Sequence, residues 1–332
     1  DSSSTDADNA GTIIKLDSVT TGRYKLRYDG AVIVECFGAK GDGVTDDTTA
    51  IQNALNISKK ALLISGKTYL AGNLNAVPLG SLKAVGGRAI IKIKNDTSVG
   101  LNIKVSNFEL DCVDFNGGST AVFNVESPTF GTKIGVYIGN LFGTGVQLQN
   151  ISVSNSEIYG CDYAGLYGGE VQIGFVFGHR VTLHNVNCHH NYINMFFDTR
   201  FEYTNATLCY GYNGYAGIIV AGGNNKITSS SFENNWENCQ LTTGENDSHG
   251  GFVNCSFNHA ITGGYGLHAY YVDNGMAFTN CFFWYAPIHL NICTGVQIRN
   301  SEIVNSAISV ISGGVNSIDD NYTKNAITPT LT

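Results

Sequence analysis

A short phrase recurs through most of this chain: an apolar residue, any residue, asparagine, any two residues, and a second apolar residue. It reads VSNFEL, VSNSEI, LHNVNC, YTNATL, FVNCSF, FTNCFF and IRNSEI, and ITSSSF fits with serine in place of asparagine. The asparagine or serine at the third position of each phrase, which we call the anchor, recurs about every 24 residues on average. The anchors are Asn107, Asn155, Asn185, Asn205, Ser230, Asn254, Asn280 and Asn300. The long gap between the first two anchors predicts one weaker turn of the solenoid between them. A period of this length indicates a solenoid.

Each repeat contains at least two short strands. The phrase itself alternates apolar and polar residues, which is a strand pattern. A second apolar stretch follows within the repeat, as in GIIVAG, GLHAY and ISVI. A unit this small cannot bury its own apolar face, so it must stack on its neighbours. We therefore predict a parallel β-solenoid with the anchor asparagines in a hydrogen-bonded ladder and with Cys255 and Cys281 stacked inside. An irregular β-sandwich is the alternative.

The second strands of the repeats can be aligned by turning their aliphatic residues inward. One outward column is then predicted to contain Tyr167, Phe196, Ile219, Gln240, His268, His289 and Ser309. One step along the strands, the next positions are Asp198, Ala221, Thr242, Tyr270 and Asn291. This surface has many aromatic and histidine side chains and few acids, so each acid near it is a candidate for chemistry.

Composition narrows the classes of function. The chain has 332 residues, a net charge of −8, 40 glycines and 4 prolines. The absence of a basic stripe argues against a nucleic-acid partner, and no apolar run reaches the roughly 20 residues of a membrane span. The nine cysteines are scattered, so neither a zinc site nor a disulfide framework is expected. The polar start has no signal peptide and no initiator Met, and we expect a trimmed chain.

The stretch GVTDDTTAIQNALNIS has the pattern of a helix start. Thr45, Asp46 and Asp47 stand where N-cap residues belong, because their oxygens can accept the unpaired N–H groups of a first helical turn. Asp42 falls in the glycine-rich turn before them. We therefore predict that these aspartates shape a turn and cap a helix, and that they neither bind a metal nor catalyse a reaction.

The same region carries a family resemblance. FGAKGDGVTDDTTAIQNAL resembles the first motif of the pectate-lyase-like β-helix superfamily, and TIIKLDSVTTGRYKLRYDGAVIVECFGAKGDG resembles bacteriophage tailspikes with depolymerase activity. The resemblance implies an all-β, right-handed parallel β-helix with a short N-terminal capping helix. It divides the chain into a linking segment at 1–35, a capping helix with the first strands at 36–75, and the β-helix at 76–332.

The resemblance also implies a function. A tailspike of this kind is a homotrimer on the virion tail that binds and cleaves a bacterial surface polysaccharide, capsular or exopolysaccharide. We therefore expect an endo-acting glycosidase with no cofactor, no nucleic-acid partner and no membrane insertion. Hydrolysis of a glycosidic bond needs two carboxylates, one to donate a proton and one to attack or to activate water.

The catalytic candidates are the acids near the outward positions, namely Asp198, Glu202, Glu233 and Glu237. FFDTRFEY is expected to place Asp198, Arg200 and Glu202 on one strand face. Asp198 and Glu237 are about two rungs apart, or roughly 10 Å along the axis, near the upper limit for an inverting pair. Asp162 in GCDYAG is a further candidate. The alternative is a solvated charge network around Arg200.

The candidates for substrate binding are Arg200, Trp236, His268 and Tyr270, which offer a cation and rings near those acids. His189 and His190 are adjacent on a predicted strand. Neighbouring side chains of a strand point to opposite faces, so no metal site is predicted there.

Three other functions remain open. A polysaccharide lyase has the same type of substrate but needs cationic groups to stabilise an anion, and only 19 lysines and arginines occur. An adhesin would use the same groove to bind glycan without cleaving it. A secreted microbial cell-wall enzyme is the last alternative, which the missing signal peptide disfavours.

Overall fold

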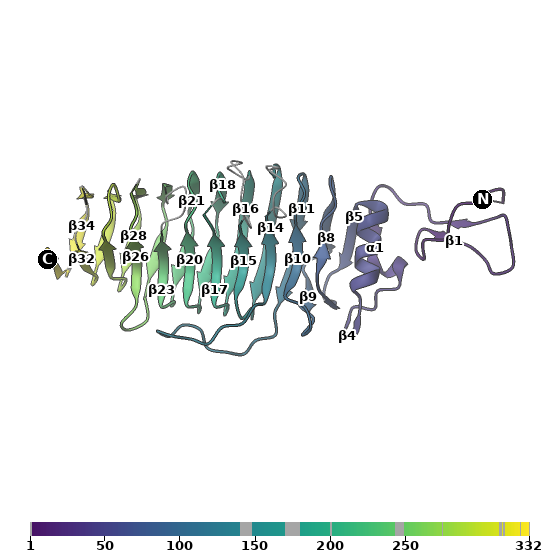
Figure 1. Ribbon diagram of the computed structural model, residues 1–332, viewed down its shortest axis with the longest axis horizontal. Helices are drawn as coiled ribbons and strands as arrows, with labels where there is room; N and C mark the ends of the chain where they lie inside the picture. The colour runs from purple at the N-terminus through teal and green to yellow at the C-terminus, as the bar shows by residue number, and fades with distance from the viewer. Residues whose placement is uncertain are drawn as a thin grey trace.

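The computed structural model describes residues 2–139, 148–169, 180–199, 201–242, 249–273, 275–311, 314, 316–325 and 327–331. These residues form an elongated right-handed parallel β-solenoid of about 11 turns (Figure 1). The predicted fold class is confirmed, and the β-sandwich alternative is excluded because successive repeats pair in parallel. The strands form two continuous sheets, a small one and a large one.

The small sheet contains the second strand of each repeat, stacked in order along the axis. Its strands are β7 (Leu74–Asn75), β10 (Val99–Ile103), β13 (Ile134–Ile138), β15 (Ala164–Gly168), β17 (Ile193–Phe197), β20 (Ala216–Val220), β23 (Glu237–Leu241), β26 (Tyr265–Tyr270), β29 (Ile288–Asn291), β32 (Ala307–Ile311) and β35 (Ile327–Leu331). Its register confirms the predicted outward column from Tyr167 to Ser309, with each residue paired to the next.

The large sheet receives two strand segments from each turn of the coil, fused into one strand in β14 and β16. Its strands are β3 (Val32–Ile33), β4 (Asp42–Asp46), β5 (Lys60–Ile64), β6 (Thr68–Ala71), β8 (Ser81–Val85), β9 (Ala89–Ile93), β11 (Phe108–Asp111), β12 (Val113–Asn116), β14 (Ile151–Tyr159), β16 (Val181–His189), β18 (Thr204–Thr207), β19 (Tyr210–Tyr212), β21 (Asn225–Thr228), β22 (Ser231–Glu233), β24 (Gly250–Val253), β25 (Ser256–Asn258), β27 (Met276–Thr279), β28 (Phe282–Trp284), β30 (Gln297–Arg299), β31 (Glu302–Val304), β33 (Ser317–Asp319) and β34 (Tyr322–Lys324).

The chain bends between the two segments at a residue with positive φ. These residues form one column, which is Cys112, Asn155, Asn185, Leu208, Ser229, Asn254, Asn280, Asn300 and Asp320. Asparagine tolerates this conformation better than most residues, which explains the recurring phrase. Part of the predicted ladder is present, because Asn185 Nδ2 donates to Asn155 Oδ1 over 2.9 Å. The predicted anchors Asn107, Asn205 and Ser230 were wrong, since Cys112, Leu208 and Ser229 occupy the bend in those rungs.

The long first gap does not contain a weaker turn, so that prediction was wrong. β11 and β12 pair directly with β14, one rung away. Part of the extra length is a strap at 117–133, which leaves the coil after β12 and returns at β13 (Figure 1). The strap reaches across several rungs, because Asn124 Nδ2 donates to the Asn234 carbonyl over 3.4 Å.

The interior of the solenoid is packed with stacked side chains of the same kind. Phe252 stacks on Phe278 with ring centroids 4.9 Å apart. Cys255 and Cys281 are both 2% exposed and share a register, which confirms their predicted stacking. All nine cysteines lie in the described part of the chain, and none forms a disulfide. Buried asparagines at the corner before the small sheet bond the neighbouring rung, as Asn235 does to the Gly211 carbonyl.

The one α-helix of the described residues, α1 (Thr48–Ser58), covers the first turn of the coil after the short 3₁₀ helix η1 (Val34–Phe37). The predicted helix start is confirmed, but the Asp47 side chain does not cap it: its oxygens accept the Lys40 and Gly41 N–H groups instead. Asp46 accepts the Thr48 N–H, and Asp42 accepts those of Val44 and Thr45. The bonds from backbone N–H groups to these carboxylates stabilise the turn, because each places a negative charge beside otherwise unpaired donors.

Before the solenoid, β1 (Ile13–Ile14) and β2 (Tyr24–Lys25) form an antiparallel pair in a small N-terminal lobe (Figure 1). The boundaries at 1–35, 36–75 and 76–332 stay predictions. Within the described residues, no helix has the length and apolar character needed to cross a membrane.

Candidate functional site

The structure separates the predicted acids. Asp198 and Glu202 do not lie on a strand face, because β17 ends at Phe197 and the chain turns there. The turn forms because Phe197 and Phe201 are both buried and pack against each other. Asp198 Oδ2 accepts a 2.6 Å hydrogen bond from the Tyr167 hydroxyl, and Glu202 is 2% exposed. Arg200 lies outside the described residues.

Glu233 and Asp162 also have positions that differ from the prediction. Glu233 is an exposed residue of β22 in the large sheet, so it does not share a face with Glu237 in the small sheet. Asp162 fixes the end of the strap, since its Oδ1 accepts the Lys133 N–H over 2.7 Å. We therefore read Asp162 as a structural residue.

Asp198 and Glu237 cannot form the predicted inverting pair. Ile193, Ala216 and Glu237 occupy one column of the small sheet, and Asp198 lies five positions further along the strand. Five positions correspond to about 16 Å, which adds to the roughly 10 Å between two rungs. The two offsets are perpendicular, so they combine to a separation of about 19 Å. This exceeds the ~6.5–9.5 Å of inverting enzymes.

Three of the other predicted residues do converge, in a group that we call the Glu237 cluster: Tyr215, Glu237, Tyr265, His268, Tyr270 and His289. Glu237 begins β23 and is 3% exposed. Its Oε1 lies 2.8 Å from His268 Nδ1 and 3.5 Å from the Tyr215 hydroxyl. The His268 ring centroid lies 3.8 Å from that of Tyr270 and 4.2 Å from that of Tyr265. Trp236 is half-buried, directly before Glu237.

The electrostatics of the Glu237 cluster are those of a buried carboxylate. Burial, followed by the negative charge of Glu237, raises the pKa of Tyr215 and Tyr270. Burial and the neighbouring His268 lower the pKa of His289. Glu237 Oε2 is buried and has no hydrogen-bond partner among the described residues. One oxygen of this carboxylate is therefore paired, and the other is not.

A second group on the large sheet was missed by the sequence analysis. The Glu157 cluster consists of Arg88, Asp114, Glu157, Tyr159, His189 and Tyr212. Asp114 and Glu157 lie on neighbouring rungs, and the Glu157 N–H donates to Asp114 Oδ1 over 2.8 Å. Arg88 Nη2 contacts both carboxylates, at 2.5 Å from Asp114 Oδ1 and 3.1 Å from Glu157 Oε2. The two carboxylates are therefore close neighbours with a common cationic partner.

Aromatic rings extend the Glu157 cluster along the sheet. His189 Nε2 lies 2.5 Å from Glu157 Oε1, and its ring stacks between Tyr159 and Tyr212 at 5.2 and 4.8 Å. Glu157 is half-buried and accessible, whereas Asp114 is 7% exposed. Burial raises the pKa of Asp114, although the Glu157 N–H and Arg88 both act to lower it. The two carboxylates are thus in different environments.

The side chains of His189 and His190 do not point to opposite faces of the strand, so that prediction was wrong. Their Nδ1 atoms are 2.7 Å apart, because His190 has a positive φ and ends the strand. Nevertheless, no group of three or more histidine, cysteine, aspartate or glutamate side chains suited to a metal ion occurs among the described residues.

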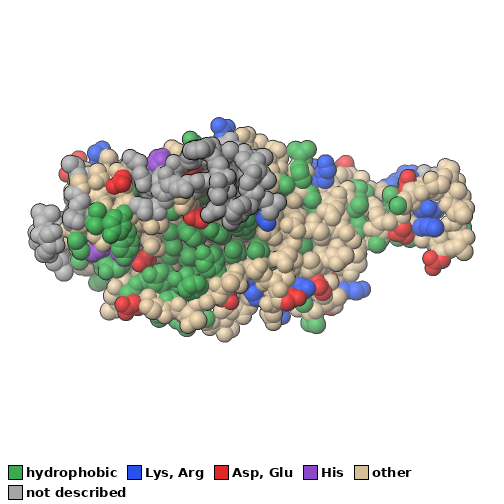
Figure 2. Space-filling model, viewed as in Figure 1, with side chains coloured by type: hydrophobic (Ala, Val, Ile, Leu, Met, Phe, Trp, Pro, Cys, Tyr) green, Lys and Arg blue, Asp and Glu red, His purple; other side chains and the backbone are tan. Residues whose placement is uncertain are grey.

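An apolar patch covers the middle of the small sheet (Figure 2). It consists of Ala164, Ile193, Ala216 and Ile219 with the rings of Tyr163, Tyr167, Tyr192, Phe196 and Tyr215 around them. The strap lies against it, since Phe130 stacks on Tyr192 with centroids 4.6 Å apart. The patch ends at Glu237 and Gln240, where the outward residues become polar.

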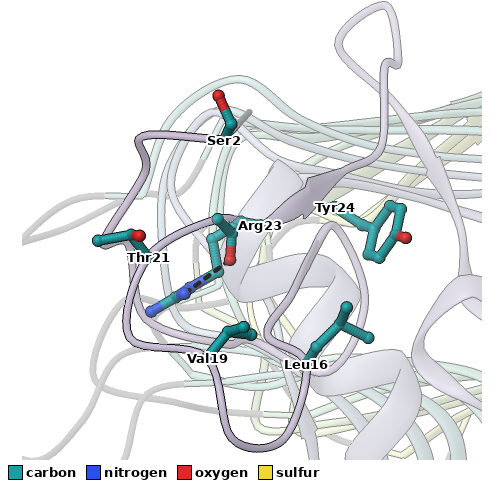
Figure 3. Close-up of a pocket in the computed structure, with 7 residues that line it drawn as sticks. Ser2, Leu16, Val19, Thr21, Arg23 and Tyr24 are labelled. Atoms are coloured by element: carbon teal, nitrogen blue, oxygen red, sulfur yellow. Dashed lines mark hydrogen bonds between the residues drawn. The ribbon is translucent and has the colours of Figure 1, made fainter.

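A pocket in the N-terminal lobe lies far from both clusters in the sequence (Figure 3). Its lining contains apolar and hydroxyl side chains and one cation, namely Ser2, Leu16, Val19, Thr21, Gly22, Arg23 and Tyr24. Arg23 Nη1 is bonded to the Gly22 carbonyl over 2.7 Å. With no carboxylate or imidazole in this lining, the pocket offers no acid–base pair.

Comparison with known proteins gives relatives over part of the chain. No protein-family model matches. A segment is 37% identical over 149 residues to a depolymerase of Klebsiella phage K64-1 described as specific for capsule K30/K69, and a depolymerase of Klebsiella phage K5-2 with the same specificity is 33% identical over 146 residues. The alignments cover 41% of this chain but only 19% and 18% of the relatives. The chain therefore matches less than a fifth of these proteins.

Solved structures resemble the whole chain. The enzymatically active domain of tailspike protein 2 of bacteriophage CBA120 has a TM-score of 0.66 at 15% identity, over 98% of this chain and 50% of that one. The A-module of the Azotobacter vinelandii mannuronan C-5 epimerase AlgE4 has a TM-score of 0.58 at 16% identity, over 90% and 97%. At these identities the likeness concerns the fold. This chain therefore shares the fold of this tailspike domain and of this epimerase module.

Proposed function

We propose that this chain is the β-helix part of a phage tailspike that binds and cleaves a bacterial capsular polysaccharide by hydrolysis. The capsule-specific depolymerases that match part of the chain support the substrate class and the location on the virion tail. The elongated shape supports an endo-acting enzyme, because a polysaccharide can lie along many rungs. Homotrimer formation is part of the proposal, and light scattering of the purified protein would test it.

The single observation that carries hydrolysis is the pair of carboxylates in the Glu157 cluster. Asp114 and Glu157 lie on neighbouring rungs, and strands of a sheet are about 4.8 Å apart. Retaining glycosidases have carboxyl groups about 5–5.5 Å apart, so the spacing favours retention of configuration.

The two environments assign different roles. Burial favours the protonated form of Asp114, which suits a general acid that donates its proton to the leaving glycosidic oxygen. Glu157 is accessible and contacts Arg88 and His189, which suits a nucleophile at the anomeric carbon. Water then hydrolyses the resulting ester while the Asp114 carboxylate takes up a proton, which restores the starting state.

Capsular polysaccharides from K30 and K69 strains of Klebsiella are the first substrates to test. Glu157→Gln and Asp114→Asn should each lower the release of reducing ends by at least about 100-fold. The matched control is Glu302→Gln, because Glu302 is an exposed acid in the same outward column and should be dispensable. Unchanged cleavage by Glu157→Gln would contradict the assignment. An unsaturated uronate product, seen by ultraviolet absorbance, would replace hydrolysis by the lyase alternative.

A further inference from the structure

The Glu237 cluster is not needed for the hydrolysis proposed above, yet it contains a carboxylate in an unusual position. In the first outward column of the small sheet, successive rungs carry Ile134, Ala164, Ile193 and Ala216 before Glu237. A carboxylate thus takes the place that apolar side chains hold in the four preceding rungs. It is also 97% buried, since its exposed fraction is 3%.

Only one of the two oxygens of this buried carboxylate has hydrogen-bond partners among the described residues. Oε1 has the imidazole of His268 and the hydroxyl of Tyr215, whereas Oε2 has no partner among the described residues. A buried acceptor without a donor costs about 1–3 kcal/mol, and more when it is charged. Such an atom is typical of a binding site, because a ligand donor can recover that free energy.

The side chains around Glu237 match one type of ligand. Tyr265, Tyr270 and His289 are half-buried, so their rings are accessible in part. The cluster contains no lysine or arginine side chain. Aromatic rings beside a hydrogen-bond acceptor suit a pyranose ring, which has an apolar face for stacking and hydroxyl groups that donate to a carboxylate.

The contacts of the strap with the small sheet extend to the rung of Glu237. Its Phe123 and Phe130 contact Tyr192, and Asn124 bonds to the carbonyl of Asn234, in the corner before Glu237. The strap therefore lies against the apolar patch at Tyr192 and reaches the rung of Glu237. The cluster continues beyond it through His268 and His289, where the outward side chains are polar.

We infer that the Glu237 cluster is a second carbohydrate-binding site, on a different sheet from the Glu157 cluster, that takes a neutral pyranose unit of a polysaccharide. The sugar ring lies against Tyr265 or Tyr270, and a small rotation of that half-buried ring lets a sugar hydroxyl donate to Glu237 Oε2. His268 holds Glu237 in place through its Nδ1 atom. The site binds without cleaving, since the described residues give it one carboxylate and not two.

Tryptophan fluorescence can report on ligand binding at this site. The chain has only two tryptophans, Trp236 directly before Glu237 and Trp284 on the large sheet. Trp284→Phe leaves Trp236 as the single tryptophan, which can be excited selectively above the absorption of tyrosine. Oligosaccharides prepared by partial acid hydrolysis of K30 and K69 capsular polysaccharides are the probes. Titration should produce a saturable change in Trp236 emission.

Variants then test the cluster in the Trp284→Phe background. Tyr270→Ala and Glu237→Leu should each weaken binding about tenfold or more, since each removes a ligand contact. Tyr285→Ala, which removes an exposed ring elsewhere, is the matched control and should leave the titration unchanged. Far-UV circular dichroism checks folding, and Glu237→Gln, which keeps the size of the side chain, serves if Glu237→Leu does not fold.

The outcomes separate this inference from the proposed hydrolysis. Glu157→Gln should stop cleavage and leave the fluorescence titration intact, so binding can persist even if no cleavage is found. No fluorescence response to either set of oligosaccharides, or a response that Tyr270→Ala leaves unchanged, would overturn the inference. Loss of turnover in Glu237→Gln at saturating polysaccharide, with binding kept, would also overturn it, because Glu237 would then act in catalysis.

Discussion

Glu157 and Glu237 each meet a histidine, but in opposite surroundings. Glu157 is accessible, has Arg88 as a second partner, and has a carboxylate neighbour one rung away. Glu237 is buried among tyrosines and histidines, and its second oxygen has no hydrogen-bond partner within the described part of the chain. Acids on one β-helix can therefore differ in role according to their partners and their burial. Two neighbouring carboxylates are suited to cleavage of a polysaccharide, whereas one buried carboxylate is suited to recognition of a sugar.

The largest expected difference between the clusters is in stability. His268→Leu leaves Glu237 buried without its ionisable partner, which should lower the free energy of unfolding by about 3–5 kcal/mol. His189→Leu leaves Glu157 with Arg88 and with solvent, so the cost should be about 1 kcal/mol or less. Urea unfolding followed by circular dichroism measures both. Equal costs would mean that the two environments do not differ as described.

A second difference concerns pH, and it involves Asp114. Burial raises its folded pKa above the value of about 3.9 in the unfolded chain. The protonated carboxyl therefore stabilises the folded state fully below pH about 4, and this contribution is lost as the pH rises through the folded pKa. The melting temperature of the wild type should fall relative to that of Asp114→Asn over this range. A constant difference between the two proteins from acid to neutral pH would exclude the raised pKa.

The smallest expected effect concerns salt. Arg88 is 44% exposed, so its pairing with Asp114 and Glu157 is partly screened. Arg88→Met should cost about 1 kcal/mol at low ionic strength and less in roughly 1 M sodium chloride. The cost of His268→Leu should not change with salt, because that pair is buried. A salt-dependent His268→Leu cost would indicate that solvent reaches Glu237.

The sequence predicted the repeat and the outward column of the small sheet, because alternation fixes which side chains face out once the aliphatic residues face in. It misplaced three bends, since Leu208, Cys112 and Ser229 adopt positive φ without the residue type that normally favours it. Periodicity specifies the faces of a solenoid well and the positions of its bends less well.

The Glu157 cluster could not be found by spacing. Asp114 and Glu157 are neighbours in space, yet 43 positions separate them, because the strap and a further connection are inserted into that rung. Their adjacency breaks the period of about 24 residues that the other rungs follow. Asp198 and Glu237 lie two rungs apart as predicted, but the prediction ignored their offset along the strand. Insertions and strand position thus limited the prediction of the site.

The Glu157 cluster is proposed to cleave the polysaccharide and the Glu237 cluster to bind it. One pair of variants tests this assignment directly. Cleavage of K30 and K69 capsular polysaccharides should be measured for Glu157→Gln and Glu237→Gln over a range of polysaccharide concentrations. We predict that Glu157→Gln lowers kcat at least about 100-fold, whereas Glu237→Gln raises KM and leaves kcat within about threefold of the wild type. The opposite pattern, with kcat lost in Glu237→Gln and retained in Glu157→Gln, would contradict the account.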